Sequence, residues 1–345
     1  MLPLAGIRVL DFSTLLPGPL AGLFLTETGA EVIKVERPGI GDEMRTYEPK
    51  LGVDGANFVL LNRGKRSVSI DLKASDTIAR LTPLIQSADV LIEQFRPGVM
   101  QRLGLGFDTL SRINSRLIYC SITGFGQTGA SGMPHTPLAD IAGGSYPAGI
   151  NILLALLQRQ RTGRGTYLDI SMADNLFLLA YWELASGFST DAWPKAGAAL
   201  TTGGSPRYRI YRTADGGYLS AGPIEQRFWE VFCRLIKLDE SLRDDSRDPD
   251  ATRRGVAACI SAYPTAHWQR VFDGADACCA VVTSLEEAVQ DPQVIARNLF
   301  ARRASSGARA IPALPVPIVE ALRDPAITRF APRLGADRNL VEAET

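Results

Sequence analysis

The first half of the chain alternates short apolar strands with helices, and this alternation restricts the fold more than any other feature. Five runs rich in aliphatic residues are typical of strands: residues 7–12, 31–36, 67–71, 88–92 and 116–121. Helical segments are predicted after the first run, ending near Thr28, and again over residues 75–87. Apolar strands of this kind belong to a parallel sheet covered on both faces. We therefore predict a large Rossmann-like α/β domain over residues 1–195.

A change of composition near residues 198–206, which are small and flexible, indicates the end of this domain. The sequence from Tyr208 to Ser220 is typical of a β-hairpin that turns at Asp215-Gly216. Three segments with helical spacing follow it: residues 228–238, 252–262 and 265–272. This order predicts a smaller α+β domain over residues 206–300. Residues 301–345 contain a proline-rich run that is expected to be extended.

Charge and cysteine usage narrow the classes of partner. Lys+Arg and Asp+Glu both number 37, so the net charge is zero, which argues against nucleic acid or an anionic membrane as the main partner. The longest apolar run, Ala148–Leu157, is too short to span a bilayer and is predicted to be a buried helix. The five cysteines lack metal-binding spacing and are expected to be reduced thiols of a cytoplasmic protein. With only two histidines, His135 and His267, no metal centre is predicted.

The stretch from Arg161 to Asp174 is the strongest candidate for chemistry. It has the pattern of a glycine turn, a short strand ending near Ile170 and a helix beginning near Ser171. Asp174 then lies in or near the first helical turn, where unpaired N–H groups and the helix dipole stabilise a negative charge. A carboxylate held there can act as a nucleophile or as a base. From spacing alone, a plain helix cap is the more common role of an aspartate at such a position.

Several sequence blocks, taken in order, resemble the class III CoA-transferase and α-methylacyl-CoA racemase superfamily over residues 4 to about 300. Each block is weak evidence alone, but their common order is strong evidence for the family. The blocks are Leu4–Phe12, Gly18-Pro19, Thr28–Pro38, Leu61–Lys73, Asp89–Gly98, Arg102–Gly106, Leu117–Gly129, the Asp174 segment and Tyr211–Gly216.

The resemblance implies an architecture. Proteins of this superfamily have a Rossmann-like large domain, which two long connecting segments join to a small domain. Their C-terminal segment, here residues 301–345, returns to the large domain. Two subunits thread through each other as interlocked rings, so the resemblance implies a homodimer.

Coenzyme A is the implied ligand, as part of the substrate and not as a tightly bound cofactor. Its phosphates call for Arg, Lys and backbone N–H donors. The positions that correspond to the family's CoA site are Leu16, Pro17, Arg37, Lys73, Gln94, Phe95, Arg96 and Arg102. Lys65 and Arg66 are further candidates for phosphate contacts, although a solvated surface position is favoured for both. Taken singly, such charges are more often solvated surface residues.

Asp174 matches the catalytic aspartate of the transferases, and Asp169 matches a structural position. The implied substrates are an acyl-CoA and a carboxylic acid. In the implied mechanism, Asp174 attacks the thioester carbonyl, and an aspartyl anhydride and then an aspartyl-CoA thioester follow. Such anhydrides hydrolyse readily, so the site must exclude water. Gly203-Gly204 lies where the family has a glycine-rich lid, although a plain interdomain linker accounts for it equally well.

Racemases of this superfamily instead use two acid/base groups on opposite faces of the α-carbon. Asp174, assisted by Glu225, matches one of them. The other is a histidine after the Gly-Gln-Thr-Gly turn, where this chain is short and offers only His135. Either the segment after Gly129 is deleted, or a longer loop is absent from the sequence as given. We predict CoA transfer, with racemisation, or CoA binding without turnover, as the alternatives.

Overall fold

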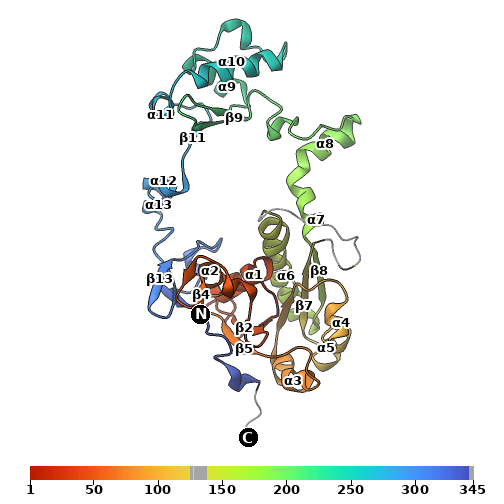
Figure 1. Ribbon diagram of the computed structural model, residues 1–345. Helices are drawn as coiled ribbons and strands as arrows, with labels where there is room; N and C mark the ends of the chain where they lie inside the picture. Colours follow the sequence, from red (N-terminus) through yellow and green to blue (C-terminus); the bar gives the residue numbers. More distant parts are fainter. Residues whose placement is uncertain (125–126, 128–137, 342–345) are drawn as a thin grey trace. The chain divides into compact units, whose positions relative to one another are not determined.

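The computed structural model describes residues 1–124, 127 and 138–341, and the chain forms two compact units (Figure 1). The first unit is Met1–Leu179 with Gln293–Thr345, and the second is Ala180–Pro292. The predicted domain limits differ slightly from these bounds. Helix α8 (Tyr181–Thr190) groups with the second unit, and residues 293–300 group with the first.

A six-stranded parallel sheet forms the centre of the first unit, in the order β5-β2-β1-β6-β7-β8. Its strands are β1 (Arg8–Asp11), β2 (Glu31–Glu36), β5 (Arg66–Ser69), β6 (Val90–Glu93), β7 (Ile118–Thr123) and β8 (Tyr167–Ser171). The chain adds strands to one side of β1 and then, from β6 onward, to the other side. This is the Rossmann-like winding that the sequence predicts, with its reversal between β1 and β6.

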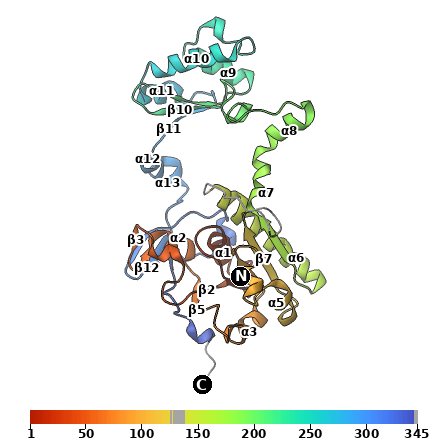
Figure 2. The same cartoon turned by 45° about the vertical axis from the view of Figure 1, so that its right-hand side comes forward.

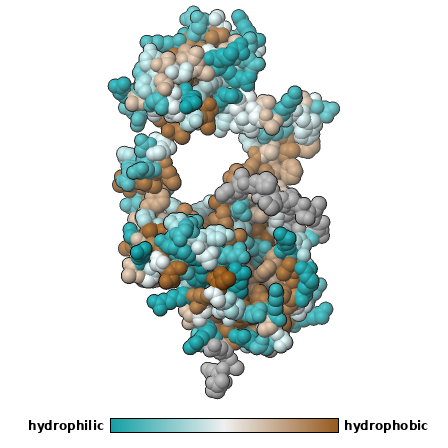
Figure 3. Space-filling model, in the orientation of Figure 1, coloured by the Kyte–Doolittle hydropathy of each residue, from teal (hydrophilic) through white to brown (hydrophobic). Residues whose placement is uncertain are grey.

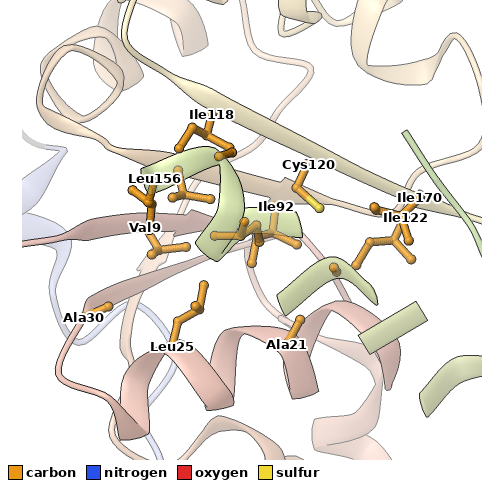
Figure 4. Close-up of a cluster of buried hydrophobic side chains, with 14 of the residues drawn as sticks. Val9, Ala21, Leu25, Ala30, Ile92, Ile118, Cys120, Ile122, Leu156 and Ile170 are labelled. Carbon is orange, nitrogen blue, oxygen red and sulfur yellow. The ribbon is translucent and has the colours of Figure 1, made fainter. Parts of the chain in front are cut away.

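Helices cover both faces of this sheet. They are α1 (Pro17–Glu27), α3 (Thr77–Ser87), α4 (Val99–Arg102), α5 (Phe107–Ile113), α6 (Tyr146–Thr162) and α7 (Met172–Leu176), whereas α2 (Ala56–Asn62) packs against α1 and the C-terminal segment. Because side chains alternate along a strand, Val9 packs with α1 and α6 on one face (Figure 4), while Leu10 packs with α3 and α5 on the other. Two separate apolar cores therefore hold the sheet between helical layers.

Helix α6 departs from the prediction of a buried helix. Ala148, Ile152 and Ala155 are buried against the sheet, but Leu154 and Leu157 are each 58% exposed. Together with the preceding π-helical turn, α6 forms a helical stretch, Ala139–Thr162, that is long and apolar enough to cross a membrane. Core helices that are mostly buried have the same length and apolar composition. In this stretch, 44% of the most apolar 18-residue segment is buried.

The C-terminal segment belongs to the first unit. It forms a three-stranded sheet in the order β13-β12-β14, from β12 (Arg303–Ser306), β13 (Arg309–Pro312) and β14 (Thr328–Phe330). Strand β12 contacts α2, near the hairpin of β3 (Lys50–Leu51) and β4 (Asp54–Gly55), as Figures 1 and 2 show. Further along, Asp337 accepts hydrogen bonds from Ser67 N at 2.9 Å and from Arg66 Nε at 2.7 Å, beside β5.

The second unit is a small α+β body, as predicted. Strands β9 (Arg209–Arg212), β10 (Tyr218–Ala221) and β11 (Cys279–Val282) form an antiparallel sheet in the order β11-β10-β9. Hairpin β9–β10 confirms the turn predicted at Asp215-Gly216. An aromatic core with Trp229, Phe232, Trp268 and Phe272 joins the sheet to α9 (Gln226–Leu235), α10 (Pro249–Ser261) and α11 (Thr265–Phe272).

Candidate active site

A pocket of about 340 Å³ lies in the first unit at the carboxyl ends of β1, β2 and β6. The reversal of strand order between β1 and β6 leaves a crevice there, the usual ligand position in doubly wound sheets. Its walls come from the segments that directly follow these strands and β5: Phe12, Ser13, Thr14, Lys34, Val35, Glu36, Arg37, Gly41, Asp42, Glu43, Asp71, Leu72, Lys73, Phe95, Val99 and Leu103.

Three of the residues predicted to bind CoA line this pocket: Arg37, Lys73 and Phe95. Arg37 and Lys73 are exposed cations on loops that follow neighbouring strands. Arg37 Nε donates to Gly41 O at 3.2 Å, and its Nη2 is 3.5 Å from a carboxylate oxygen of Glu43. Both cations are therefore available to an anionic ligand at the rim of the pocket.

Leu16, Pro17 and Gln94 lie on the segments that enclose this region but are not among its lining residues. Pro17 begins α1 and is buried, and Gln94 Oε1 accepts a hydrogen bond from Gly18 N at 3.1 Å. A Cβ on Gly18 would lie 2.2 Å from Ser13 Cβ, so only glycine fits there. These contacts fasten the start of α1 to the end of β6.

Arg96 and Arg102 are exposed and do not line the pocket. The expectation that Lys65 contacts phosphate is wrong. Its side chain is 0% exposed, and Nζ binds Asp11 Oδ2 at 2.8 Å, Pro19 O at 2.9 Å and Asn62 Oδ1 at 2.9 Å. Arg66 is bound to carboxylates of Glu31 and Asp337, so neither cation is free for a ligand.

Two buried ion pairs, Asp11–Lys65 and Lys34–Asp42, lie at or next to the wall of the pocket. Burial raises the pKa of the Asp11 carboxyl, but the charges of Lys65 and Lys34 and two hydrogen bonds outweigh it and lower the pKa to about 2. Burial lowers the pKa of Lys65 to about 8, although Asp11 acts in the opposite direction. Lys34 Nζ is 2.9 Å from Asp42 Oδ2, with both side chains 0% exposed.

Asp174 occupies the position that the sequence predicts, at the start of the helix after β8. Ser171 is the N-cap of α7, and its Oγ accepts a hydrogen bond from Asp174 N at 3.3 Å. Asn175 Nδ2 fixes the turn by donating to Gly143 O at 2.8 Å and to Ser171 O at 3.0 Å. Asp174 itself is exposed, and none of the residues that the structure describes bonds to its carboxylate. The cap is Ser171, which leaves the Asp174 carboxylate free to react.

Asp169 has a different environment on β8. Its two carboxylate oxygens accept from Gln127 N at 3.2 and 3.0 Å, and Gln127 Nε2 donates to Ser121 Oγ at 2.6 Å. Nearby, burial raises the pKa of Glu93, whose carboxylate accepts from Phe95 N at 2.8 Å. Asp169 is thus tied to the end of β7.

In the second unit, Glu225 directly precedes α9, is exposed, and its carbonyl accepts from Phe228 N at 3.1 Å and from Trp229 N at 3.0 Å. Gly203 has a φ of +95°, and a Cβ on Gly204 would lie 2.0 Å from Ala198 O, so the backbone requires both glycines. His135 lies outside the described residues.

Sequence reasoning missed the buried charges Asp11, Lys34 and Asp42. A signal was present for Lys34, because a lysine within the apolar strand Val32–Val35 must find a counter-charge when the strand is buried. Asp42 carried no comparable signal, since nothing in its loop indicates that it meets Lys34.

Comparisons with known proteins agree with this architecture. The model of CoA-transferase family III matches residues 4–135 and 131–338, and the two segments meet in the stretch after Gly129. The α-methylacyl-CoA racemase of Homo sapiens is 35% identical, over 95% of this chain and 88% of its own length. The acetyl-CoA:oxalate CoA-transferase of Acetobacter aceti is 32% identical, over 96% of this chain and 93% of its own length. A crystal structure of a CAIB/BAIF family protein from Brucella suis has a TM-score of 0.81 at 25% identity and covers 99% of both chains.

The alignment with one of these relatives is longer than this chain. The comparison with the Acetobacter aceti protein extends over 373 positions, whereas this chain has 345 residues. That relative therefore contains residues that this chain lacks.

Proposed function

Because the chain belongs to CoA-transferase family III, we propose that it transfers coenzyme A from an acyl-CoA to a carboxylic acid through a covalent intermediate on Asp174. The observation that carries this proposal is the exposed Asp174 carboxylate at the start of α7, directly after β8, to which no residue that the structure describes is bonded.

The reaction begins when a carboxylate oxygen of Asp174 attacks the carbonyl carbon of the acyl-CoA. The carbon–sulfur bond breaks, CoA leaves as a thiolate, and an acyl–aspartyl anhydride forms. The thiolate attacks the aspartyl carbonyl, which releases the donor acid and gives an aspartyl-CoA thioester. An acceptor carboxylate then attacks this thioester, and the same two steps run in reverse to give the new acyl-CoA and free Asp174.

Binding of the CoA moiety is assigned in this proposal to the pocket at the ends of β1, β2 and β6. Arg37 and Lys73, on its wall, supply positive charge for the phosphates, and Phe95 supplies an apolar surface for the base. Arg96 and Arg102 are exposed nearby in sequence and provide further positive charge; Leu16, Pro17 and Gln94 shape the adjoining turn. Gly203-Gly204 is assigned the role of the family's glycine-rich lid on the resemblance alone, and such a lid would keep water from the anhydride.

The substitution Asp174→Asn tests the nucleophile. It removes the attacking oxygen while keeping size and shape, so we expect exchange to fall at least about a thousandfold. Mass spectrometry of new acyl-CoA, formed from an acyl-CoA and a free acid, measures exchange, and calorimetry measures CoA binding, which is expected to persist. Asp169→Asn is the matched control on the same segment and is expected to keep activity within about tenfold. Full exchange activity in Asp174→Asn would contradict the proposal that Asp174 is the nucleophile.

Racemisation is the second candidate, and Glu225 favours it, since this exposed carboxylate lies on the segment entering α9 where the racemase pattern has its glutamate. Incubating an (R)-2-methylacyl-CoA in D₂O, once with and once without a free carboxylic acid, distinguishes the two functions. Deuterium at the α-carbon indicates the racemase and brings His135 into the mechanism. New acyl-CoA that forms only with added acid indicates the transferase. CoA binding with neither product indicates a binding protein without turnover.

A further inference from the structure

A basic hollow of about 470 Å³ lies within the second unit, between the edge strand β9 and helix α10. Among the residues that the structure describes, its lining contains one carboxylate, that of Asp250, and four guanidinium groups. The arginines are Arg209, Arg212, Arg253 and Arg254. One carboxylate against four cations leaves three positive charges unbalanced in the lining, although the chain as a whole has no net charge.

Contacts within the second unit hold two of these guanidinium groups in place. Arg253 is half-buried, its Nη2 pairs with Asp250, and its Nη1 donates to Gly204 O at 3.2 Å. Arg209 Nη1 donates to Gly203 O. Each of the two arginines keeps further N–H donors that no described residue uses. Both groups are therefore positioned without being fully satisfied.

The other two arginines have unused donors. Arg212 and Arg254 are exposed, and no residue that the structure describes bonds to either side chain. Ala257, one turn further along α10 than Arg253 and Arg254, also lines the hollow, and its small side chain leaves the space beside them open. The hollow thus offers room together with several free donors.

Protection of the sheet edge accounts for only part of this arrangement. Charged side chains on an edge strand prevent it from pairing with another sheet, and Arg209 and Arg212 of β9 can serve in this way. Arg253 and Arg254 lie on α10, where there is no strand edge to protect. Like charges gathered around one hollow repel each other, and a bound anion would offset that repulsion.

We propose that this hollow binds an oligophosphate, that is, an anion with two or more linked phosphate groups. Guanidinium groups bind phosphate oxygens through paired, charge-assisted hydrogen bonds. An anion with several charges matches four arginines better than a single carboxylate does. The described residues that line this hollow differ from those of the pocket to which CoA binding is assigned, so the inference does not rest on the proposed function.

Isothermal titration calorimetry with inorganic pyrophosphate at physiological ionic strength tests the site. The background is Arg37→Gln with Lys73→Gln, which removes the two cations at the rim of the first unit's pocket. Adding Arg212→Gln and Arg254→Gln is expected to weaken binding at least about tenfold, because both side chains lose charge-assisted hydrogen bonds to the anion. The far-UV circular dichroism spectrum should not change, since neither side chain bonds to a described residue.

The matched control is Arg234→Gln with Arg270→Gln in the same background. These arginines are exposed on α9 and α11 of the second unit, and neither lines the hollow. The control removes the same charge and should leave the dissociation constant within about twofold, because salt screens distant charges. Equal weakening by the two pairs of substitutions overturns the inference, as does the absence of pyrophosphate binding.

Chemical modification locates the bound anion. Phenylglyoxal reacts with exposed arginine side chains, and peptide mass spectrometry quantifies the reaction at each position. With pyrophosphate at ten times its dissociation constant, modification of Arg212 and Arg254 is expected to slow about tenfold, since about a tenth of the sites remain empty. Modification of Arg234 should not change. Calorimetric binding without protection of Arg212 and Arg254 overturns the assignment of the anion to this hollow.

Titrations with orthophosphate and ADP define the anion. Orthophosphate is expected to bind at least about tenfold more weakly than pyrophosphate, because it reaches fewer of the guanidinium groups. Equal affinity for the two contradicts the requirement for linked phosphates. ADP that binds as tightly as pyrophosphate, with the same dependence on Arg212 and Arg254, supports a nucleotide as the source of the phosphates, whereas weaker binding of ADP supports an inorganic oligophosphate.

Discussion

At the scale of single residues, buried ion pairs shape the walls of the pocket to which CoA binding is assigned in our proposal. Lys34 Nζ donates to Ser13 O at 2.8 Å and pairs with Asp42, whose Oδ1 accepts from Leu15 N at 3.2 Å and Met44 N at 3.0 Å. These bonds join the loop after β1 to the turn that follows β2. Buried pairs of this kind are poor evidence for stability as such, but they fix geometry when every charge has a partner.

The free energy of unfolding at acidic pH tests the role of the Asp11–Lys65 pair. The pKa of Asp11 is about 2 in the folded unit against an ordinary value of 3.8, so its stabilising contribution is present above pH 3.8 and is lost as the pH falls toward 2. The pKa of Lys65, about 8, keeps the amine protonated throughout this range. We expect this carboxyl to contribute about 2 kcal/mol to the free energy of unfolding, most of it lost by pH 2. Urea unfolding followed by far-UV circular dichroism measures it.

The control for this prediction is the double substitution Asp11→Asn with Lys65→Met, which removes both charges. The difference in free energy of unfolding between wild type and double variant is expected to shrink by about 2 kcal/mol between pH 4 and pH 2. Other carboxylates titrate in both proteins and cancel. A difference that does not change with pH contradicts the assigned role of Asp11.

At the scale of elements, Glu27 connects the C-terminal segment to the sheet domain. This residue ends α1, its side chain is 0% exposed, and it binds Arg63 Nη2 at 3.1 Å and Arg302 Nη1. Arg302 directly precedes β12, and Arg63 Nη2 also donates to Leu314 O at 2.9 Å. One carboxylate therefore holds two arginines from segments far apart in the sequence.

Removing this carboxylate is expected to loosen the first unit. Glu27→Gln leaves two largely buried arginines without a counter-charge and should cost about 3–5 kcal/mol of unfolding free energy. Far-UV circular dichroism reports the change. Tryptophan fluorescence should barely shift, because Trp182, Trp193, Trp229 and Trp268 all belong to the second unit. The control is Glu43→Gln, which removes a half-exposed ion pair and is expected to cost below about 1 kcal/mol. Equal effects of both substitutions refute the role of Glu27.

The elements of the fold differ in how far the sequence alone could predict them. Strand β2 has the predicted limits, and Asp174 has the predicted place after β8, because local periodicity and capping determine both. The partners of Lys65 and Glu27 were not predictable, since those ion pairs join residues 54 and 275 positions apart. The prediction that α6 is buried was wrong for a related reason. The apolar content of a helix predicts that apolar groups cover it, but it does not tell whether those groups belong to the same chain.

At the scale of the whole molecule, the exposed apolar surface of the first unit bears on the proposed homodimer. Ile150, Leu153, Leu154 and Leu157 of α6 are each at least 43% exposed, and Phe177, Leu178 and Leu179 after α7 at least 53%. Figure 3 shows hydrophobic surface where the chain continues beyond α7. Isolated exposed aliphatic residues are normal, but a cluster of this size usually marks a protein interface. A second copy of the chain is the occupant that the family resemblance implies.

The substitutions Leu154→Glu and Leu157→Glu together test that assembly. Two carboxylates buried in an apolar interface without partners would each cost several kcal/mol, so the variant should fail to assemble into the dimer when it folds. Light scattering coupled to size-exclusion chromatography should give a mass near 75 kDa for the wild type, about twice the 37.3 kDa of one chain, and near one chain mass for the variant. Val53→Glu, at an 82% exposed aliphatic residue in the β3–β4 hairpin, should stay dimeric. If the wild type is monomeric, or if the double variant keeps the dimer mass with unchanged circular dichroism, then α6 is not the interface, and its exposed leucines require another explanation.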